Sequence, residues 1–87
     1  MEIEKYLVNK GFNPTLKGFD YIVSAVQLIR EDRSYKFNTT KKLYPKLCEI
    51  YGDSQANVER AIRSSITNAG LDYSNSEFIA IAEIESR

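Results

Sequence analysis

Apolar residues recur three and four positions apart along most of the chain, a period that predicts helices. The strongest stretch is residues 17–30, whose apolar stripe consists of Phe19, Ile22, Val23, Val26 and Ile29. Further apolar residues widen this stripe, so we expect this helix to be the most buried one. The same period predicts helices over residues 2–10, 42–51, 55–68 and 75–85. No segment keeps the alternation of a strand, which indicates an all-α bundle of about five helices.

Helix start and stop signals separate these segments. Gly11 and Gly52 each follow a periodic stretch, where glycine ends helices. Ser54 has the position of an N-cap for the helix at 55–68. Ser74 and Glu77 have the spacing of a capping box before the last helix. The polar segment 32–40 lacks a helical period, so we expect a loop there, with its two aromatic residues packed against the body.

Residues 42–68 have the layout of a helix-turn-helix, a unit whose second helix enters the DNA major groove. Gly52 supplies the residue with positive φ that the tight turn requires. Val58 and Ala61 follow as apolar residues six and nine positions later, and Cys48 is small enough for a helix crossing. The residues left facing outward near the start of the second helix are Ser54, Gln55, Ala56, Glu59, Arg60 and Arg63.

These residue types suit base and phosphate recognition. Arginine pairs with guanine through two hydrogen bonds, and glutamate accepts one from the cytosine amino group. Gln55 could read adenine or contact a phosphate, and Ser54 at the helix N-terminus could hold a phosphate oxygen. Lys41 and Lys42 lie where a DNA backbone would run. On spacing alone, a solvated helix face with a local Glu59–Arg63 pair remains an equal alternative.

Composition narrows the function classes. The 87 residues suffice for one domain, residues 1–87, and the apolar runs are too short to span a membrane. The net charge is zero, but residues 30–63 carry eight basic and five acidic side chains. A single cysteine and an acidic N-terminus without signal-peptide features predict a cytoplasmic protein. The chain has no histidine and no phosphate-loop glycines, so we expect neither an enzyme nor a cofactor or metal site.

Three segments carry a family resemblance. They are the Leu-Lys-Gly-Phe-Asp-Tyr element at 16–21, the Val-Glu-Arg-Ala-Ile-Arg element at 58–63 and the Asn-Ser-Glu-Phe-Ile-Ala element at 75–80. In this order the segments resemble the C-terminal DNA-binding effector domain of the stage-zero sporulation protein A family, from about Ile3 to Ile84. The resemblance implies a transcription regulator whose recognition helix, here residues 55–68, reads a short promoter element in double-stranded DNA.

The resemblance also implies where contacts should fall. Glu59, Arg60 and Arg63 match base- and phosphate-contacting positions, and Asn57 stands where the family often has an arginine. The link at 69–74 is shorter than the family's, and the 87 residues have no room for the phosphorylated receiver domain that normally precedes this module. If they are the natural protein, we expect it to be constitutive or to be controlled through its abundance or a partner. In that family the final helix helps two copies meet, which would place Phe78, Ile79 and Ile84 at a homodimer or heterodimer contact. The rival hypothesis is a module that pairs with a full-length regulator of the same family.

Overall fold

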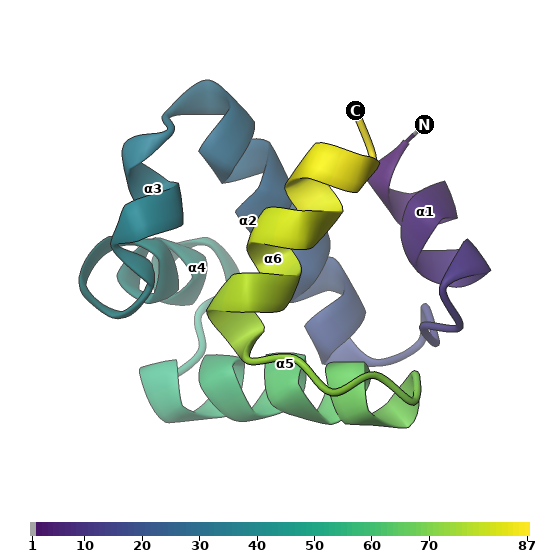
Figure 1. Ribbon diagram of the computed structural model, residues 1–87. Coiled ribbons are helices and arrows are strands. Elements are labelled where there is room, and N and C mark those ends of the chain that lie inside the picture. Colours follow the sequence, from purple (N-terminus) through teal and green to yellow (C-terminus); the bar gives the residue numbers. More distant parts are fainter. Residues whose placement is uncertain (1) are drawn as a thin grey trace.

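The computed structural model describes residues 2–87, which form helices joined by short connections (Figure 1). In chain order the elements are α1 (Ile3–Asn9), α2 (Lys17–Glu31), α3 (Ser34–Phe37), the π-helical turn η1 (Thr39–Leu43), α4 (Tyr44–Tyr51), α5 (Gln55–Asn68) and α6 (Asn75–Glu85). The five predicted helices are confirmed, with ends that differ by at most two residues. The all-α fold class is therefore correct.

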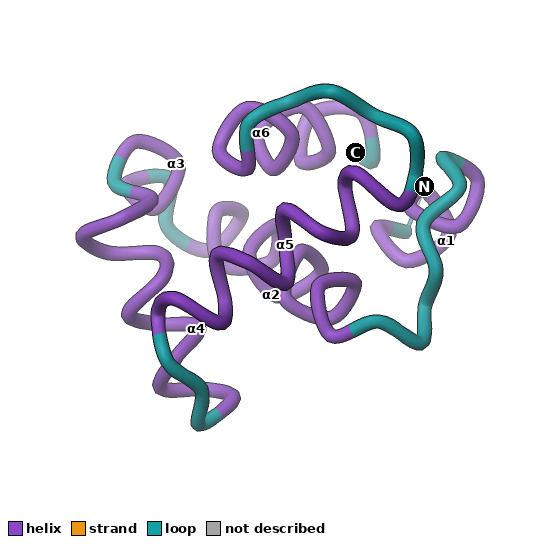
Figure 2. Tube along the Cα trace, turned by 90° about the horizontal axis from the view of Figure 1, so that it is seen from below, coloured by secondary structure: helices purple, strands orange, loops and turns teal. Residues whose placement is uncertain are grey.

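Helix α2 is the centre of the molecule, as its broad apolar stripe predicted. Ile22, Ala25 and Val26 are fully buried, and α2 contacts each of the other five α-helices. Helix α6 crosses in front of α2, and α5 lies along the lower edge of the view in Figure 1. Turned by 90°, the molecule presents α5 toward the viewer, with the other helices behind it (Figure 2). One long side of α5 thus faces away from the body.

A glycine allows α2 and α5 to pack closely. A side chain at Gly18 would overlap the backbone carbonyl of Ala61 and the hydroxyl of Ser65. The resemblance element at 16–21 therefore has a structural explanation, because its glycine removes the atoms that would hold the two helices apart. This crossing therefore sets how closely α5 packs against α2.

The segment at 32–40 is not the loop that the sequence predicted. It contains α3 and the start of η1, two elements too short to show an apolar period. The Asp32 carboxylate accepts hydrogen bonds from the backbone N–H and hydroxyl of Ser34, at 3.0 and 2.8 Å, and so starts α3. Of the two aromatic residues expected to anchor the segment, Tyr35 packs against the core, whereas Phe37 is 77% exposed.

The inner face of α4 also differs from the prediction. Leu43 and Leu47 are buried as expected, but Ile50 and Tyr51 are 49% and 40% exposed. Tyr44 is buried in their place. The last turn of α4 lies at the edge of the body, where the Tyr51 ring packs against the Tyr21 ring of α2 with centres 4.8 Å apart, so its apolar residues are only partly covered.

Candidate nucleic-acid interface

The turn between α4 and α5 forms as the sequence predicted. Gly52 has φ of 65° and ends α4 in the left-handed conformation. The carbonyl of Cys48 accepts the backbone N–H groups of Gly52 and Asp53, at 2.8 and 3.3 Å. The Ser54 hydroxyl then accepts the N–H of Asn57 at 3.2 Å, which confirms the predicted N-cap of α5. Helices α4 and α5 form the helix-turn-helix.

The inner face of α5 holds this helix against the body. Val58 and Ile62 are fully buried, and Ile66 is 2% exposed. Burying side chains of this size stabilises the fold by about 1.5–3 kcal/mol each relative to exposure. The rotation of α5 about its own axis is therefore fixed, and the side chains on the opposite face have a defined direction.

The outer face of α5 brings together the residues predicted from spacing. Exposed residues run along the whole helix, and Glu59 is half-buried at its edge. The face also continues further than expected, because three polar residues of the second half lie on it: Ser64, Thr67 and Asn68. The helical period from Arg60 would have identified them, since 60, 63, 64, 67 and 68 share one side of a helix.

The middle of this face is positively charged. Arg60 has no hydrogen-bond or ion-pair partner among residues 2–87, and Arg63 pairs with Glu59 one turn before it. Arg60, Arg63 and the three polar residues of the second half line a shallow hollow of about 390 Å³, and no acidic residue lines it. Two guanidinium groups thus face outward on one helix, with donors free to bind anionic or acceptor-rich groups.

Side-chain hydrogen bonds hold the first turn of α5. The Gln55 amide nitrogen donates to the carbonyl of Thr40 at 3.1 Å, which connects α5 to η1. The Asn57 amide nitrogen donates to Asp53 at 3.0 Å, and the hydroxyl of Tyr21 donates to the other oxygen of Asp53 at 2.6 Å. The bond to Asp53 raises the pKa of Tyr21 to about 12, and the same bond lowers the pKa of Asp53. These bonds orient the two amides before any ligand arrives.

Lysines flank α5 on two sides. Lys41 on η1 is exposed, whereas Lys42 pairs with Asp32 at 2.9 Å and lies 4.6 Å from the centre of the Tyr35 ring. The Lys42 ammonium, together with bonds from Ser34, lowers the pKa of Asp32 to about 2. Sequence reasoning missed Lys17 at the start of α2, which lines a hollow of about 240 Å³ together with Asn57 and Arg60. Only the folded structure brings Lys17 to this helix.

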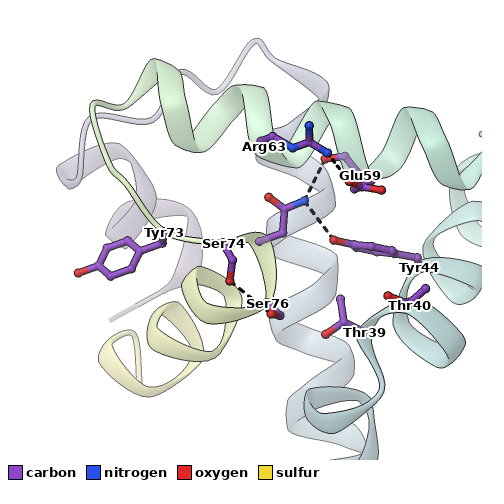
Figure 3. Close-up of a pocket in the computed structure, with 9 residues that line it drawn as sticks. Thr39, Thr40, Tyr44, Glu59, Arg63, Tyr73, Ser74 and Ser76 are labelled. Carbon is purple, nitrogen blue, oxygen red and sulfur yellow. Dashed lines mark hydrogen bonds and ion pairs between the residues drawn. The ribbon is translucent and has the colours of Figure 1, made fainter.

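Asn75 joins three elements beside this interface. It is 9% exposed, and its amide nitrogen donates to the Tyr44 hydroxyl at 3.1 Å and to the Glu59 carbonyl at 3.0 Å (Figure 3). The joint lies in a hollow of about 370 Å³ between η1, α5 and the start of α6, with Arg63 on its α5 side. Asn75 therefore holds α4, α5 and α6 in one arrangement.

The last helix begins at the predicted capping box, and the Ser74 and Glu77 side chains make both of its hydrogen bonds. The prediction that Phe78 and Ile79 line a contact between copies is wrong, because both side chains are 1% exposed and belong to the core. Their burial follows from the packing of α6 across α2. Ile84, the third residue of that prediction, is 49% exposed.

No helix within residues 2–87 has both the length and the apolar character needed to cross a bilayer. No group of three or more histidine, cysteine, aspartate or glutamate side chains in the same range is placed to hold a metal ion.

Comparison with known families identifies the fold that presents this helix face. Residues 3–77 match the family described as "Sporulation initiation factor Spo0A C terminal". The match includes the helix-turn-helix, the Gly18 crossing and the capping box of α6. This family is that of the DNA-binding effector domain of a sporulation regulator. The chain belongs to the Spo0A C-terminal family, as the three sequence segments had suggested.

Proposed function

We propose that this protein binds duplex DNA sequence-selectively and regulates transcription, with α5 lying in the major groove. The observation that carries the proposal is the outer face of α5, where Arg60 and Arg63 face outward from a helix whose inner face is locked in the core. Arginine side chains on the exposed face of a recognition helix can pair with guanine O6 and N7. Family membership supports the same function.

The flanking residues have roles in positioning the protein on the DNA backbone. Lys41 and the Ser54 hydroxyl lie at the η1 side and the N-terminus of α5, and Lys17 lies at the α2 side. Contacts to phosphates fix the register of a protein on the duplex but carry no sequence information. We assign these residues to phosphates, and we assign Ala56, Glu59, Arg60 and Arg63 to the groove.

Selection of bound sites from random duplexes tests this function. At about 50 mM salt the wild type should enrich one short sequence motif, and at about 200 mM salt the same motif should persist with weaker binding, because phosphate contacts release counterions. The Arg60→Ala, Arg63→Ala double variant should lose the motif. Arg33→Ala is the matched control, because this exposed arginine is the N-cap of α3, a helix that lies away from α5 in both views. Recovery of no motif with the wild type, or of the same motif with the double variant, would refute the proposal.

A further inference from the structure

The first turn of α5 holds an asparagine whose amide can face only one way. The Asn57 side chain is exposed, and its nitrogen lies 3.0 Å from an oxygen of Asp53. An ionised carboxylate only accepts hydrogen bonds, so the group facing it must be the amide nitrogen and not the amide oxygen. The orientation is therefore set by chemistry, and the Asn57 oxygen is the atom left for a ligand.

Asp53 is itself fixed in place. One of its oxygens accepts the Tyr21 hydroxyl at 2.6 Å, from a residue of α2 that is 4% exposed. The other oxygen also accepts the backbone N–H of Ser54 at 2.9 Å. Three donors, one from α2 and two from the start of α5, thus converge on this carboxylate. Turning the Asn57 amide over would place its oxygen against the carboxylate, and this repulsion disfavours the flipped orientation.

Gln55 follows the same rule. Its amide nitrogen donates to the backbone carbonyl of Thr40, which also can only accept, so its oxygen is the free end. Glu59, one turn later, carries a carboxylate at the edge of the same face. The first half of α5 therefore offers acceptor oxygens, and the donors of Arg60 and Arg63 come afterwards.

In the major groove, the acceptor oxygens and the donor groups of this helix would pair with different bases. Adenine N6 and cytosine N4 are the amino donors that bases present there, whereas guanine and thymine present acceptors at the corresponding positions. Asn57 lines one hollow with Arg60, so it reaches the same side of α5 as that arginine. We propose that Asn57 selects an amino base, adenine or cytosine, on the strand that it contacts, and that Asp53 is the positioning residue that enforces this choice.

This inference rests on the proposed function, and its test separates the two. Site selection is repeated with Asn57→Ala. The position of the DNA motif that loses its base preference in this variant is the one that Asn57 reads. Asn9→Ala is the matched control, because this exposed asparagine lies on α1, outside the α5 face, and should leave that preference intact. We expect adenine or cytosine at the Asn57 position. Guanine or thymine at that position, or a motif in which no position depends on Asn57, would overturn the inference. A motif recovered with the wild type would still support the proposed function.

A base analogue then tests whether Asn57 contacts the amino group of the selected base. Replacing the selected adenine with purine, or the selected cytosine with 2-pyrimidinone, removes only the amino group. Binding of the wild type should weaken about fivefold, the effect of one hydrogen bond, and Asn57→Ala should not distinguish the analogue from the natural base. Equal binding of analogue and natural base by the wild type would contradict an amino-group contact.

Asp53→Ala tests the positioning role. Without the carboxylate the Asn57 amide can turn over, so all four bases should be accepted more evenly at that position. Asp72→Ala is the control for charge, because it removes the same charge from an exposed aspartate in the link between α5 and α6. A base preference unchanged in Asp53→Ala, in protein whose circular dichroism matches the wild type, would exclude Asp53 from this role.

Discussion

Two glutamate–arginine pairs with the same spacing occupy opposite environments in this protein. Glu59 and Arg63 lie on the outer face of α5, with side chains 45% and 62% exposed. Glu83 and Arg87 close the end of α6, where the Glu83 side chain is 2% exposed. Glu83 also binds Arg30 of α2, at 3.4 Å. The same i,i+4 pattern therefore fastens a helix to the core in one place and remains available to a ligand in the other.

The difference lies in what surrounds each carboxylate. The Glu83 carboxylate accepts three guanidinium hydrogen bonds, two from Arg87 and one from Arg30, and a second Arg30 group donates to the Glu83 carbonyl and the Ser86 hydroxyl. Buried charges persist only when paired and hydrogen-bonded in this way. Glu59 has one charged partner and access to water, so the Glu59–Arg63 pair can open without leaving a buried charge alone.

Removing the buried carboxylate should have the largest effect on stability. Glu83→Ala should lower the free energy of unfolding by about 2 kcal/mol. This loss is smaller than the roughly 3–5 kcal/mol typical of breaking fully buried pairs, because the Arg30 and Arg87 side chains can be hydrated once the carboxylate is gone. Urea denaturation followed by circular dichroism measures this. The folded variant should bind DNA as the wild type does. An unchanged urea midpoint would show that the network does not hold α6.

Acid should weaken the same region next. The Arg87 and Arg30 guanidinium groups lower the pKa of Glu83 to about 2, below the usual glutamate value. Because the folded pKa is the lower one, the contribution of Glu83 is complete above the usual value and is lost as the pH falls from about 4.5 toward 2.

Unfolding measured from about pH 6 to about pH 3 should therefore show a smaller loss of stability in Glu83→Gln than in the wild type. The variant keeps some acid sensitivity, because the pKa values of Asp32, Asp53, Glu77 and Glu85 are also lowered in the fold. Parallel acid profiles for the two proteins would contradict the assignment to Glu83.

Asn75 joins the start of α6 to the backbone of α5 at Glu59, so its removal should loosen the contact between these two helices. Asn75→Ala leaves the Glu59 carbonyl and the Tyr44 hydroxyl without their shared donor, and should cost about 2 kcal/mol of stability. Thermal unfolding measures the loss, and the exposed neighbour variant Ser76→Ala serves as the control. If Asn75→Ala and Ser76→Ala have the same melting temperature, the joint between α4, α5 and α6 is not a stabilising contact.

The exposed pair should matter least for stability. Glu59→Ala should change the free energy of unfolding by less than about 0.5 kcal/mol, as for other exposed pairs. It should strengthen binding to random duplex at low salt, because it removes a negative charge beside Arg63. Fluorescence anisotropy measures this binding. A stability loss equal to that of Glu83→Ala would erase the distinction between the two pairs.

Local signals made much of the fold predictable. Helices α5 and α6 have the predicted bounds because Ser54 and Ser74 cap them with their own side chains. The outer face of α5 followed from helical period alone. The residues assigned to DNA contact, Lys41 and Lys42 among them, stay predictions that the binding experiments must decide.

The remaining features depend on partners distant in sequence. Burial of Glu83 depends on Arg30, 53 residues earlier, and burial of Tyr44 depends on Asn75, 31 residues later. Likewise, Asn57 is oriented by an aspartate that a tyrosine of α2 holds. Spacing within one helix carries no information on such contacts, which is why two identical Glu–Arg patterns could not be told apart before folding.

The affinity of the Arg60→Ala, Arg63→Ala double variant for the selected duplex tests the central claim most directly. Fluorescence anisotropy at one salt concentration should show a loss of at least tenfold, since each arginine that reads a base contributes about 1–3 kcal/mol. Arg33→Ala should bind within about twofold of the wild type, because this arginine is the N-cap of α3, a helix that lies away from α5 in both views. A double variant that binds as tightly as Arg33→Ala would contradict the assignment of the α5 outer face to DNA.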